Sequence, residues 1–114
     1  MPRSDAFIRP AWAADPRVGA LVTTRVGGVS LPPFDTLNLG RSSGDDPAAV
    51  TENRRRYEAA MGVPTVYLSQ VHGTRVLRHT AADLHAAEPQ QADACITTEP
   101  GLACTVMVAD CMPV

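Results

Sequence analysis

The chain has 114 residues and a formal net charge of −2 at pH 7, and all ten of its basic residues are arginines. This length allows one domain or less, and a slightly acidic chain with mostly dispersed arginines argues against a nucleic-acid-binding surface. No uninterrupted apolar stretch reaches about 18 residues, which argues against a membrane-spanning helix. The first residues lack the apolar core of a secretory signal, so we expect a cytoplasmic protein.

The first half of the chain predicts one short strand, a long loop and one helix. Residues 20–25 are rich in β-branched side chains and predict a strand, which ends at Gly27-Gly28. The loop that follows runs to about residue 46, and its length is typical of a functional or covering segment. Asp46-Pro47 has the form of a helix N-cap followed by proline, and Gly62 suits a left-handed C-cap. An amphipathic helix is therefore expected over residues 47–61.

The faces of this helix follow from its spacing. Apolar side chains recur at helical intervals, at Val50, Tyr57, Ala60 and Met61. The arginine triplet 54–56 lies beside acidic residues of the same helix. We expect the triplet to form a solvated face rather than a nucleic-acid contact.

The second half predicts two strands separated by a bend. Residues 65–70 form the first strand and residues 74–77 the second, with His72-Gly73 at the bend between them. A bend between strands can aim a side chain at a ligand. Residues 79–92 are polar and alanine-rich, so we expect a loop that accommodates one helical turn.

A hairpin is expected near the end of the chain. Residues 94–98 and 102–109 form its arms, and Pro100-Gly101 suits the central positions of a type II turn. The second arm is apolar on both faces, which is typical of a central strand covered on both sides. Such a strand needs neighbours on both edges, and few strands follow it. We therefore expect an incomplete domain.

The three cysteines, at positions 95, 104 and 111, do not suggest a disulfide framework, because their number is odd and no export signal is present. In the expected hairpin, Cys95 faces Val106 and Cys104 faces Thr97. This diagonal arrangement separates the two cysteine backbones by about 7–8 Å, beyond the usual disulfide span. Cys95 and Cys104 are expected to be small buried apolar side chains.

Two residues stand out as metal ligands or nucleophiles. His72 precedes a glycine at a strand end, where backbone can approach a ligand closely. Cys111 follows Asp110 at the end of the apolar arm, where it is a thiolate ligand, a nucleophile or an inert buried thiol. An imidazole and a thiolate supply two of the three protein ligands of a catalytic zinc site. His79 and His85 fall in the polar loop and are expected to be structural or exposed.

A second group of candidates follows the first strand. Arg25, Gly27, Gly28 and Ser30 form a polar, flexible segment that suits an anion such as phosphate. Asn38 lies between two leucines and is either a turn-forming residue or a substrate contact.

Several short motifs occur in one order along the chain. They are Thr23-Thr24-Arg25-Val26-Gly27-Gly28-Val29-Ser30, Pro33-Phe34, Leu37-Asn38-Leu39-Gly40, Gly44-Asp45-Asp46, Asn53-Arg54, Gln70-Val71-His72-Gly73, Ala92-Asp93-Ala94, Pro100-Gly101-Leu102 and Ala109-Asp110-Cys111. This set closely resembles the YfiH family, also described as laccase-domain polyphenol oxidases, purine nucleoside phosphorylases and peptidoglycan editing factors. The resemblance covers about residues 18–114. It implies an α+β fold, a mixed β-sheet core with flanking helices, of which residues 1–114 form the N-terminal half of a single domain.

The resemblance also implies a metal site. In the family, zinc is held by the histidine and the cysteine that fall on His72 and Cys111, and by a histidine in a downstream His-Ala-Gly-Trp-Arg segment that has no match here. It implies phosphorolysis of adenosine, guanosine and methylthioadenosine and deamination of adenosine, so nucleoside and phosphate are the expected partners, without nucleic acid or membrane. Arg25 and Asn38 are then further catalytic candidates. The substrate-binding candidates are these two residues together with Gly27, Gly28, Ser30 and Gln70.

Other activities remain as alternatives. The family implies copper-dependent phenol oxidation and, for bacterial members, editing of peptidoglycan precursors. Laccase chemistry uses several coppers and many histidines, and three histidines are few for it. A different class of answer is a truncated, non-catalytic remnant, and for the 114-residue chain by itself we expect no turnover.

Overall fold

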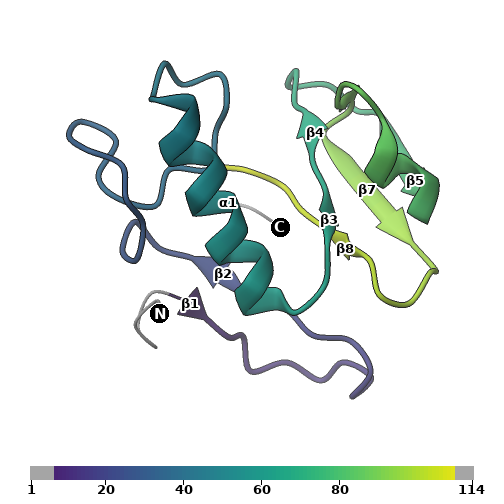
Figure 1. Ribbon diagram of the computed structural model, residues 1–114. Coiled ribbons are helices and arrows are strands. Elements are labelled where there is room, and N and C mark those ends of the chain that lie inside the picture. Colours follow the sequence, from purple (N-terminus) through teal and green to yellow (C-terminus); the bar gives the residue numbers. More distant parts are fainter. Residues whose placement is uncertain (1–6, 110–114) are drawn as a thin grey trace. The chain divides into compact units, whose positions relative to one another are not determined.

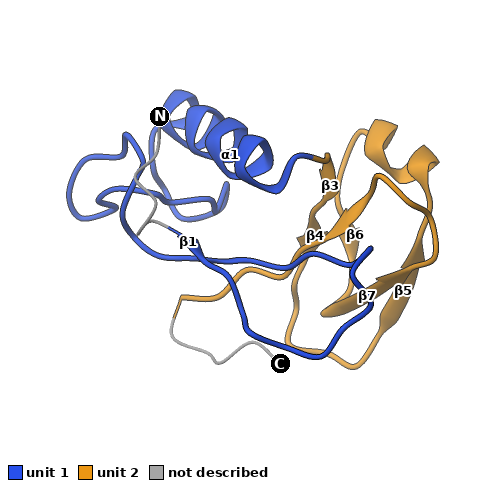
Figure 2. Ribbon diagram, turned by 90° about the horizontal axis from the view of Figure 1, so that it is seen from below, with its two compact units in different colours: residues 1–62 blue, residues 63–114 orange. Residues whose placement is uncertain are grey.

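The computed structural model describes residues 7–109. The chain divides into two compact units, Met1–Gly62 and Val63–Val114 (Figure 2). Helix and strand are both present, and the strands pair as antiparallel in the first unit and parallel in the second (Figure 1). This mixture agrees with the expected α+β class.

Unit 1 contains one pair of short strands. Strands β1 (Phe7–Ile8) and β2 (Val22–Thr23) are antiparallel, with Phe7 opposite Thr23. The strand predicted over residues 20–25 is therefore reduced to two residues. Beyond it, the carbonyl of Arg25 accepts the N–H groups of Thr36 and Leu37, so the chain leaves the ladder and pairs with its own loop.

Helix α1 (Pro47–Met61) has the predicted bounds. The Asp46 side chain accepts the Ala48 N–H at 3.0 Å, and proline occupies the first helical position. Gly62 ends the helix at φ 79°, and its N–H donates to the Glu58 carbonyl at 2.9 Å. Local signals at both ends thus determine this element.

The buried face of α1 is not wholly apolar. Val50 and Tyr57 are buried as expected, but Asn53 lies between them with no exposed surface. Its amide oxygen accepts the Val29 N–H, and its amide nitrogen donates to the Ser30 hydroxyl and to two loop carbonyls. Asn53 therefore fastens the long loop of residues 24–46 to the helix.

The arginine triplet is solvated only in part. Arg55 is exposed and pairs with Glu52 at 2.8 Å. Arg54 and Arg56 are half-buried, and their guanidinium groups donate to the carbonyls of Leu39 and Gly27. The expected solvated face holds for Arg55 but only in part for Arg54 and Arg56, because the loop supplies carbonyl acceptors beside the helix.

Up to residue 109, unit 2 is built from three parallel ladders of two strands each. The pairs are β3 (Thr65–Val66) with β8 (Ala103–Cys104), β4 (Leu68–Ser69) with β6 (Gln90–Gln91), and β5 (Val76–His79) with β7 (Ala94–Thr97). The 3₁₀ helix η2 (Ala81–His85) provides the helical turn expected in the polar loop. The strand predicted over residues 65–70 is split into β3 and β4, and the one predicted at 74–77 is displaced to β5.

The predicted hairpin was wrong in its pairing. Strand β7 is hydrogen-bonded to β5, and β8 to β3. The turn itself has the expected backbone, since Gly101 has φ 74°. A type II turn does not match the right-handed twist of paired strands, so each arm is hydrogen-bonded to a parallel strand earlier in the chain.

The second arm is also less buried than expected. Thr105 is buried, but Val106 and Val108 are exposed by 40% and 48%. Cys104 is exposed and Cys95 half-buried, and both thiols are free. Burial raises the pKa of Cys95 to about 12, together with a hydrogen bond in which its thiol donates to Cys104, so the two side chains are neighbours. The expectation of two buried apolar cysteines was wrong because the ladder partner of β8 covers only one edge.

The core of unit 2 combines apolar and hydroxyl side chains. Val66, Leu68 and Ala92 are buried, and the hydroxyls of Thr65 and Thr105 lie 2.6 Å apart in a hydrogen bond.

Over residues 7–109, no helix has the combination of length and apolar character needed to cross a bilayer.

Candidate metal centre around His72

The loop that carries His72 arises from a difference in strand register. Leu68 is opposite Gln90, 22 residues further along, whereas Val76 is opposite Ala94, 18 residues further along. The connection from β4 to β5 is therefore four residues longer than the connection from β6 to β7. The extra residues bulge out at the ends of β4 and β6 as the bend predicted at His72-Gly73.

The amide groups of this bulge find a partner in Asp93. One carboxylate oxygen accepts the N–H groups of Val71 and His72 at 3.0 and 2.8 Å, and the other accepts that of Gly73 at 2.7 Å. These bonds, that of Gly73 foremost, hold the pKa of the Asp93 carboxyl below its ordinary value. Successive N–H groups that converge on one anion form a nest, here occupied by a side chain of the same unit.

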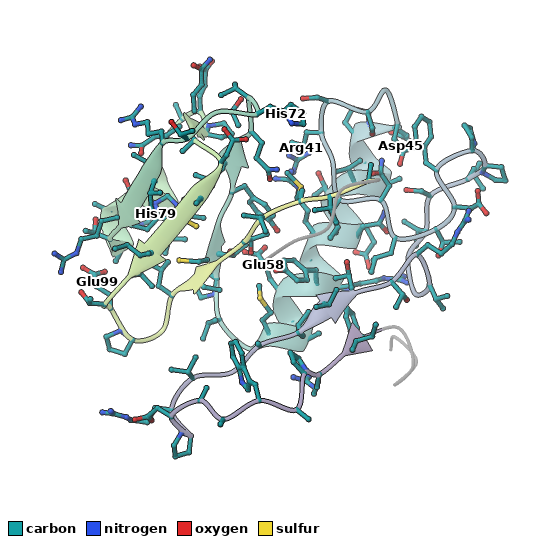
Figure 3. All side chains as sticks on the ribbon, turned by 180° about the vertical axis from the view of Figure 1, so that it is seen from behind. Arg41, Asp45, Glu58, His72, His79 and Glu99 are labelled. Atoms are coloured by element: carbon teal, nitrogen blue, oxygen red, sulfur yellow. The ribbon has the colours of Figure 1, made fainter. Side chains whose placement is uncertain are left out.

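His72 itself adopts an unusual backbone. Its φ is 59°, in the left-handed region that costs a non-glycine residue about 1–2 kcal/mol. The residue is exposed (Figure 3), and its recorded hydrogen bond to the described part of the chain is made by its backbone N–H. The backbone of His72 is held by hydrogen bonds, while among residues 7–109 its ring nitrogens are available to a ligand. Such an imidazole is suited to bind a metal ion.

Gln70 connects this loop to the segment that leads toward Cys111. Its amide nitrogen donates to the Met107 carbonyl at 2.9 Å, and its amide oxygen accepts the Met107 N–H at 2.7 Å. The side chain thus takes the place of a strand partner beyond the β3–β8 ladder. The sequence assigned Gln70 to substrate binding; in this structure its polar atoms hold Met107.

The second predicted ligand, Cys111, lies outside the described residues, as does Asp110. Between residues 7 and 109, no group of three or more His, Cys, Asp or Glu side chains is gathered as a metal ion would need. The convergence of His72 and Cys111 therefore stays a prediction. The soft thiolate and the imidazole are both donors that zinc accepts.

The candidates for an anion cradle belong to unit 1. The Arg25 guanidinium donates to the carbonyl and carboxylate of Asp35, and the Gly28 N–H donates to the Thr36 hydroxyl. Gly27 has φ 106°. Phosphate binding by this segment stays a prediction, and its donors are engaged within the loop in this structure.

The remaining unit 1 candidates have structural partners. Ser30 is buried and donates to the Asp45 carboxylate, which lowers the pKa of that carboxyl. Asn38 accepts the Gly40 N–H at 3.2 Å and donates to the Ser43 hydroxyl at 2.7 Å. These local bonds are those of a turn-forming residue, and a substrate contact by Asn38 stays a prediction.

The two other histidines differ in exposure. His85 is exposed in η2. His79 is buried in β5, its Nδ1 lies 3.5 Å from an Asp83 oxygen, and its ring nitrogens have no hydrogen-bond partner among the residues described (Figure 3). We expected these two histidines to be structural or exposed. His79 is buried and His85 is exposed, in agreement with that expectation.

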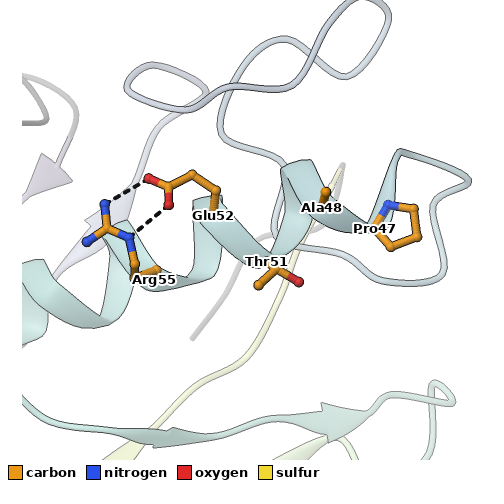
Figure 4. Close-up of a pocket in the computed structure, with 5 residues that line it drawn as sticks. All are labelled: Pro47, Ala48, Thr51, Glu52 and Arg55. Carbon is orange, nitrogen blue, oxygen red and sulfur yellow. Dashed lines mark hydrogen bonds and ion pairs between the residues drawn. The ribbon is translucent and has the colours of Figure 1, made fainter.

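An open depression lies along the first turns of α1 (Figure 4). It is lined by Pro47, Ala48, Thr51, Glu52 and Arg55, and the ion pair between the last two crosses its surface. Hydrogen bonds from Arg55 and Arg56 hold the pKa of Glu52 at about 2. No candidate residue from the sequence lines this depression.

A family model described as multi-copper polyphenol oxidoreductase laccase matches residues 19–114, a span that includes His72 and Cys111. The chain belongs to this laccase-like family. Curated relatives carry the name purine nucleoside phosphorylase: that of Pseudomonas aeruginosa is 47% identical over 96% of the chain, and YfiH of Escherichia coli is 48% identical over 95%. The chain spans 43% and 44% of the length of these two relatives.

Solved structures of similar proteins agree with the fold. The Neisseria meningitidis protein NMB0706 matches with a TM-score of 0.84 and 40% identity, over 93% of this chain and 43% of that one. YlmD of Geobacillus stearothermophilus matches with a TM-score of 0.70 and 32% identity, over 87% of this chain and 43% of that one. The resemblance drawn from the motifs is thereby confirmed.

Sequence reasoning missed the residue that shapes the site. Asp93 was noted only as part of a motif, and nothing in its local sequence shows that its carboxylate meets residues 71–73. An acidic residue directly before a strand was the available signal, because a carboxylate placed there accepts N–H groups at a neighbouring strand end.

Proposed function

We propose that the chain carries part of the site of a zinc-dependent purine nucleoside phosphorylase that also deaminates adenosine, with His72 and Cys111 as two metal ligands. The names of the curated relatives support the reaction class. The observation that supports the metal site is the pair of hydrogen bonds between the Gln70 side-chain amide and the Met107 backbone, at 2.9 and 2.7 Å.

The strand register near Gln70 and Met107 supports the proposal that His72 and Cys111 bind the same metal ion. Strands β3 and β8 run parallel with Thr65 opposite Ala103, so equivalent positions are 38 residues apart. Gln70 and Met107, beyond the strands, are 37 apart and still bonded. His72 and Cys111 are 39 apart in the sequence, so a continuation of this register beyond the strand ends would bring the two ligands to neighbouring positions. Strand ends of this kind are where α/β proteins place their ligands.

The roles of the residues follow from their chemistry. The imidazole of His72 and the thiolate of Cys111 would hold zinc, which supplies Lewis-acid polarisation when bound. Gln70 keeps the two segments together, and the exposed His72 leaves space for substrate. Copper in place of zinc is the alternative that the name of the family model raises, and thiolate and imidazole accept both metals.

Arg25 is the proposed phosphate contact. Its side chain is 71% exposed, and an exposed ion pair such as that with Asp35 contributes little free energy, so the guanidinium can exchange partners. Ser30 and the Gly28 N–H are assigned to loop structure instead. The test is the binding of inorganic phosphate by Arg25→Gln, which should require a higher phosphate concentration than binding by the wild-type chain.

The metal site is tested by zinc retention. The chain is loaded with Zn²⁺, dialysed against a mild chelator and analysed for bound metal. We expect zinc to be retained and then lost in His72→Ala and in Cys111→Ala, while the control His85→Ala, an exposed histidine of the same unit, retains it. Undiminished zinc in His72→Ala would contradict the proposal.

The reaction is tested separately. Adenosine is incubated with the zinc-loaded protein with and without phosphate, and free adenine and inosine are measured. Phosphate-dependent adenine release supports phosphorolysis, and inosine supports deamination. Zinc binding without either product would leave a metal-binding remnant as the correct description of the 114-residue chain.

A further inference from the structure

Asp93 contacts the backbone of the candidate ligand rather than its ring. The two carboxylate oxygens accept three consecutive N–H groups, those of residues 71–73, at 2.7–3.0 Å. A carboxylate accepts several hydrogen bonds and donates none, so it matches a turn that presents only N–H groups. Because the N–H groups of both His72 and Gly73 are held, the peptide planes on either side of His72 are fixed.

The carboxylate is itself held in place. The Asp93 N–H donates to the Arg75 carbonyl at 3.3 Å, so the residue bridges both ends of the bulge. Its neighbour Ala92 is fully buried and donates to the Ser69 carbonyl at 3.2 Å. Strand β7 begins at the next residue, Ala94. The anchor of the loop therefore belongs to the strand framework of unit 2.

The fit around Asp93 is close. A Cβ placed on Gly73 would lie 3.4 Å from one Asp93 oxygen, in ordinary van der Waals contact, so the carboxylate lies directly against residue 73. His72 carries a side chain and yet has φ 59°. A non-glycine residue keeps such a conformation where its surroundings impose it, and the three bonds to Asp93 are those surroundings.

We infer that Asp93 is the positioning residue of the metal centre: by holding the three N–H groups it imposes the left-handed backbone of His72 and so sets the direction of the imidazole. The inference rests on the proposed function of His72 as a ligand. Groups that orient a metal ligand commonly change metal affinity when they are altered, although they do not touch the metal.

Asp93→Asn is the direct test. The amide replaces one acceptor oxygen by an NH₂ group, which would face a backbone N–H, donor against donor. We expect the affinity of the chain for Zn²⁺, measured by competition with a chromophoric chelator, to fall about tenfold or more. The matched control is Asp83→Asn, because the Asp83 carboxylate also accepts a backbone N–H, that of Thr80 at 2.8 Å, in the same unit. The control should keep the zinc affinity of the wild type.

A measurement without metal examines the backbone itself. A positive φ brings the amide proton close to the Hα proton of the same residue, so wild-type His72 should show a strong intraresidue NOE between them. We expect this NOE to weaken in Asp93→Asn and to persist in Asp83→Asn. Where Asp93→Asn fails to fold, Asp93→Glu keeps both oxygens one methylene further away, and should show an intermediate loss of zinc affinity and a weakened NOE.

The outcomes separate the inference from the proposed function. Zinc affinity that falls in His72→Ala but not in folded Asp93→Asn would overturn the positioning role and leave the metal site standing. Zinc affinity that is unchanged in His72→Ala would contradict the metal site. In that event the NOE decides: its loss in Asp93→Asn supports the control of His72 by Asp93, and its persistence overturns it.

Discussion

Asn53 in unit 1 and His79 in unit 2 are both polar side chains with at most 1% of their surface exposed, but their hydrogen bonding differs. The Asn53 amide makes four hydrogen bonds, at 2.8–3.2 Å, to the loop that it supports. The ring nitrogens of His79 make none within residues 7–109. A buried polar group stabilises a fold when its partners are also buried, and otherwise contributes a desolvation penalty.

The difference separates two ways of building a compact unit. In unit 1 a helix of fifteen residues carries one amide that organises a long loop. In unit 2 short parallel ladders set the architecture, and the buried histidine is packed rather than bonded. The structure of unit 1 therefore depends on hydrogen bonds to one side chain, and that of unit 2 depends on strand register.

The largest expected effect comes from the loop around Asn53. A Cβ on Gly28 would lie 2.2 Å from the Thr36 carbonyl oxygen and 2.6 Å from the Asn53 amide oxygen. Gly28→Ala should therefore destabilise unit 1 by about 3 kcal/mol, because backbone must move. Urea unfolding measures the loss, and amide hydrogen exchange assigns it to unit 1. Gly19→Ala is the control, since nothing lies within 4 Å of its added Cβ; equal effects of the two would contradict the packing argument.

Removal of the Asn53 amide should have the next largest effect. Asn53→Ala removes the partner of the Val29 N–H and of the Asn38 carbonyl, while the Thr36 carbonyl keeps the Ser30 N–H, so we expect a loss of about 2–3 kcal/mol in thermal or urea unfolding. Ala59→Ser, at an exposed position of the same helix, should change stability by less than about 0.5 kcal/mol. A neutral Asn53→Ala would show that the loop does not need this anchor.

The opposite sign is expected for His79. His79→Leu replaces an imidazole without hydrogen bonds by an apolar side chain of similar size, so stability should stay level or rise by up to about 1 kcal/mol. Thermal unfolding measures the change, and His85→Leu serves as the exposed control. A loss of more than about 2 kcal/mol would mean that the ring makes bonds that contribute to folding, and the contrast with Asn53 would disappear.

The smallest effect concerns pH. The pKa of Glu52 is lowered from 4.5 to about 2 in the folded chain by Arg55 and Arg56. A lowered pKa stabilises the fold above the ordinary value, and this contribution disappears as pH falls from about 4.5 through about 2. The melting temperature should fall over this window, and the part due to Glu52 should be absent in Glu52→Gln. Identical pH profiles for the two chains would contradict the role of this ion pair.

Much of unit 1 could be predicted from the sequence. The bounds of α1 were correct because an Asp-Pro start and a glycine end act within a few residues of the chain. The role of Asn38 in a turn was equally local. Asn53 was missed, since a polar residue within an apolar stripe does not reveal which loop groups it will meet.

Less of unit 2 could be predicted. The bend at His72 followed from its neighbours, but the hairpin was wrong, because pairing compares partners that lie far apart in the sequence. Asp93 and Gln70 act over 20 and 37 residues, so nothing in the local sequence identifies their partners. The ordered motifs identified the family without any of these contacts.

The sequence by itself determined the helix with its two caps, the bend at His72 and membership of the laccase-like family. Those features depend on short-range sterics and hydrogen bonds or on the order of residues in the chain. The tertiary structure alone decided the parallel ladders, the anchoring of the loop by Asn53 and the hydrogen bonding of the His72 backbone to Asp93. These form between distant segments, where the register of strand pairing determines which donors and acceptors meet.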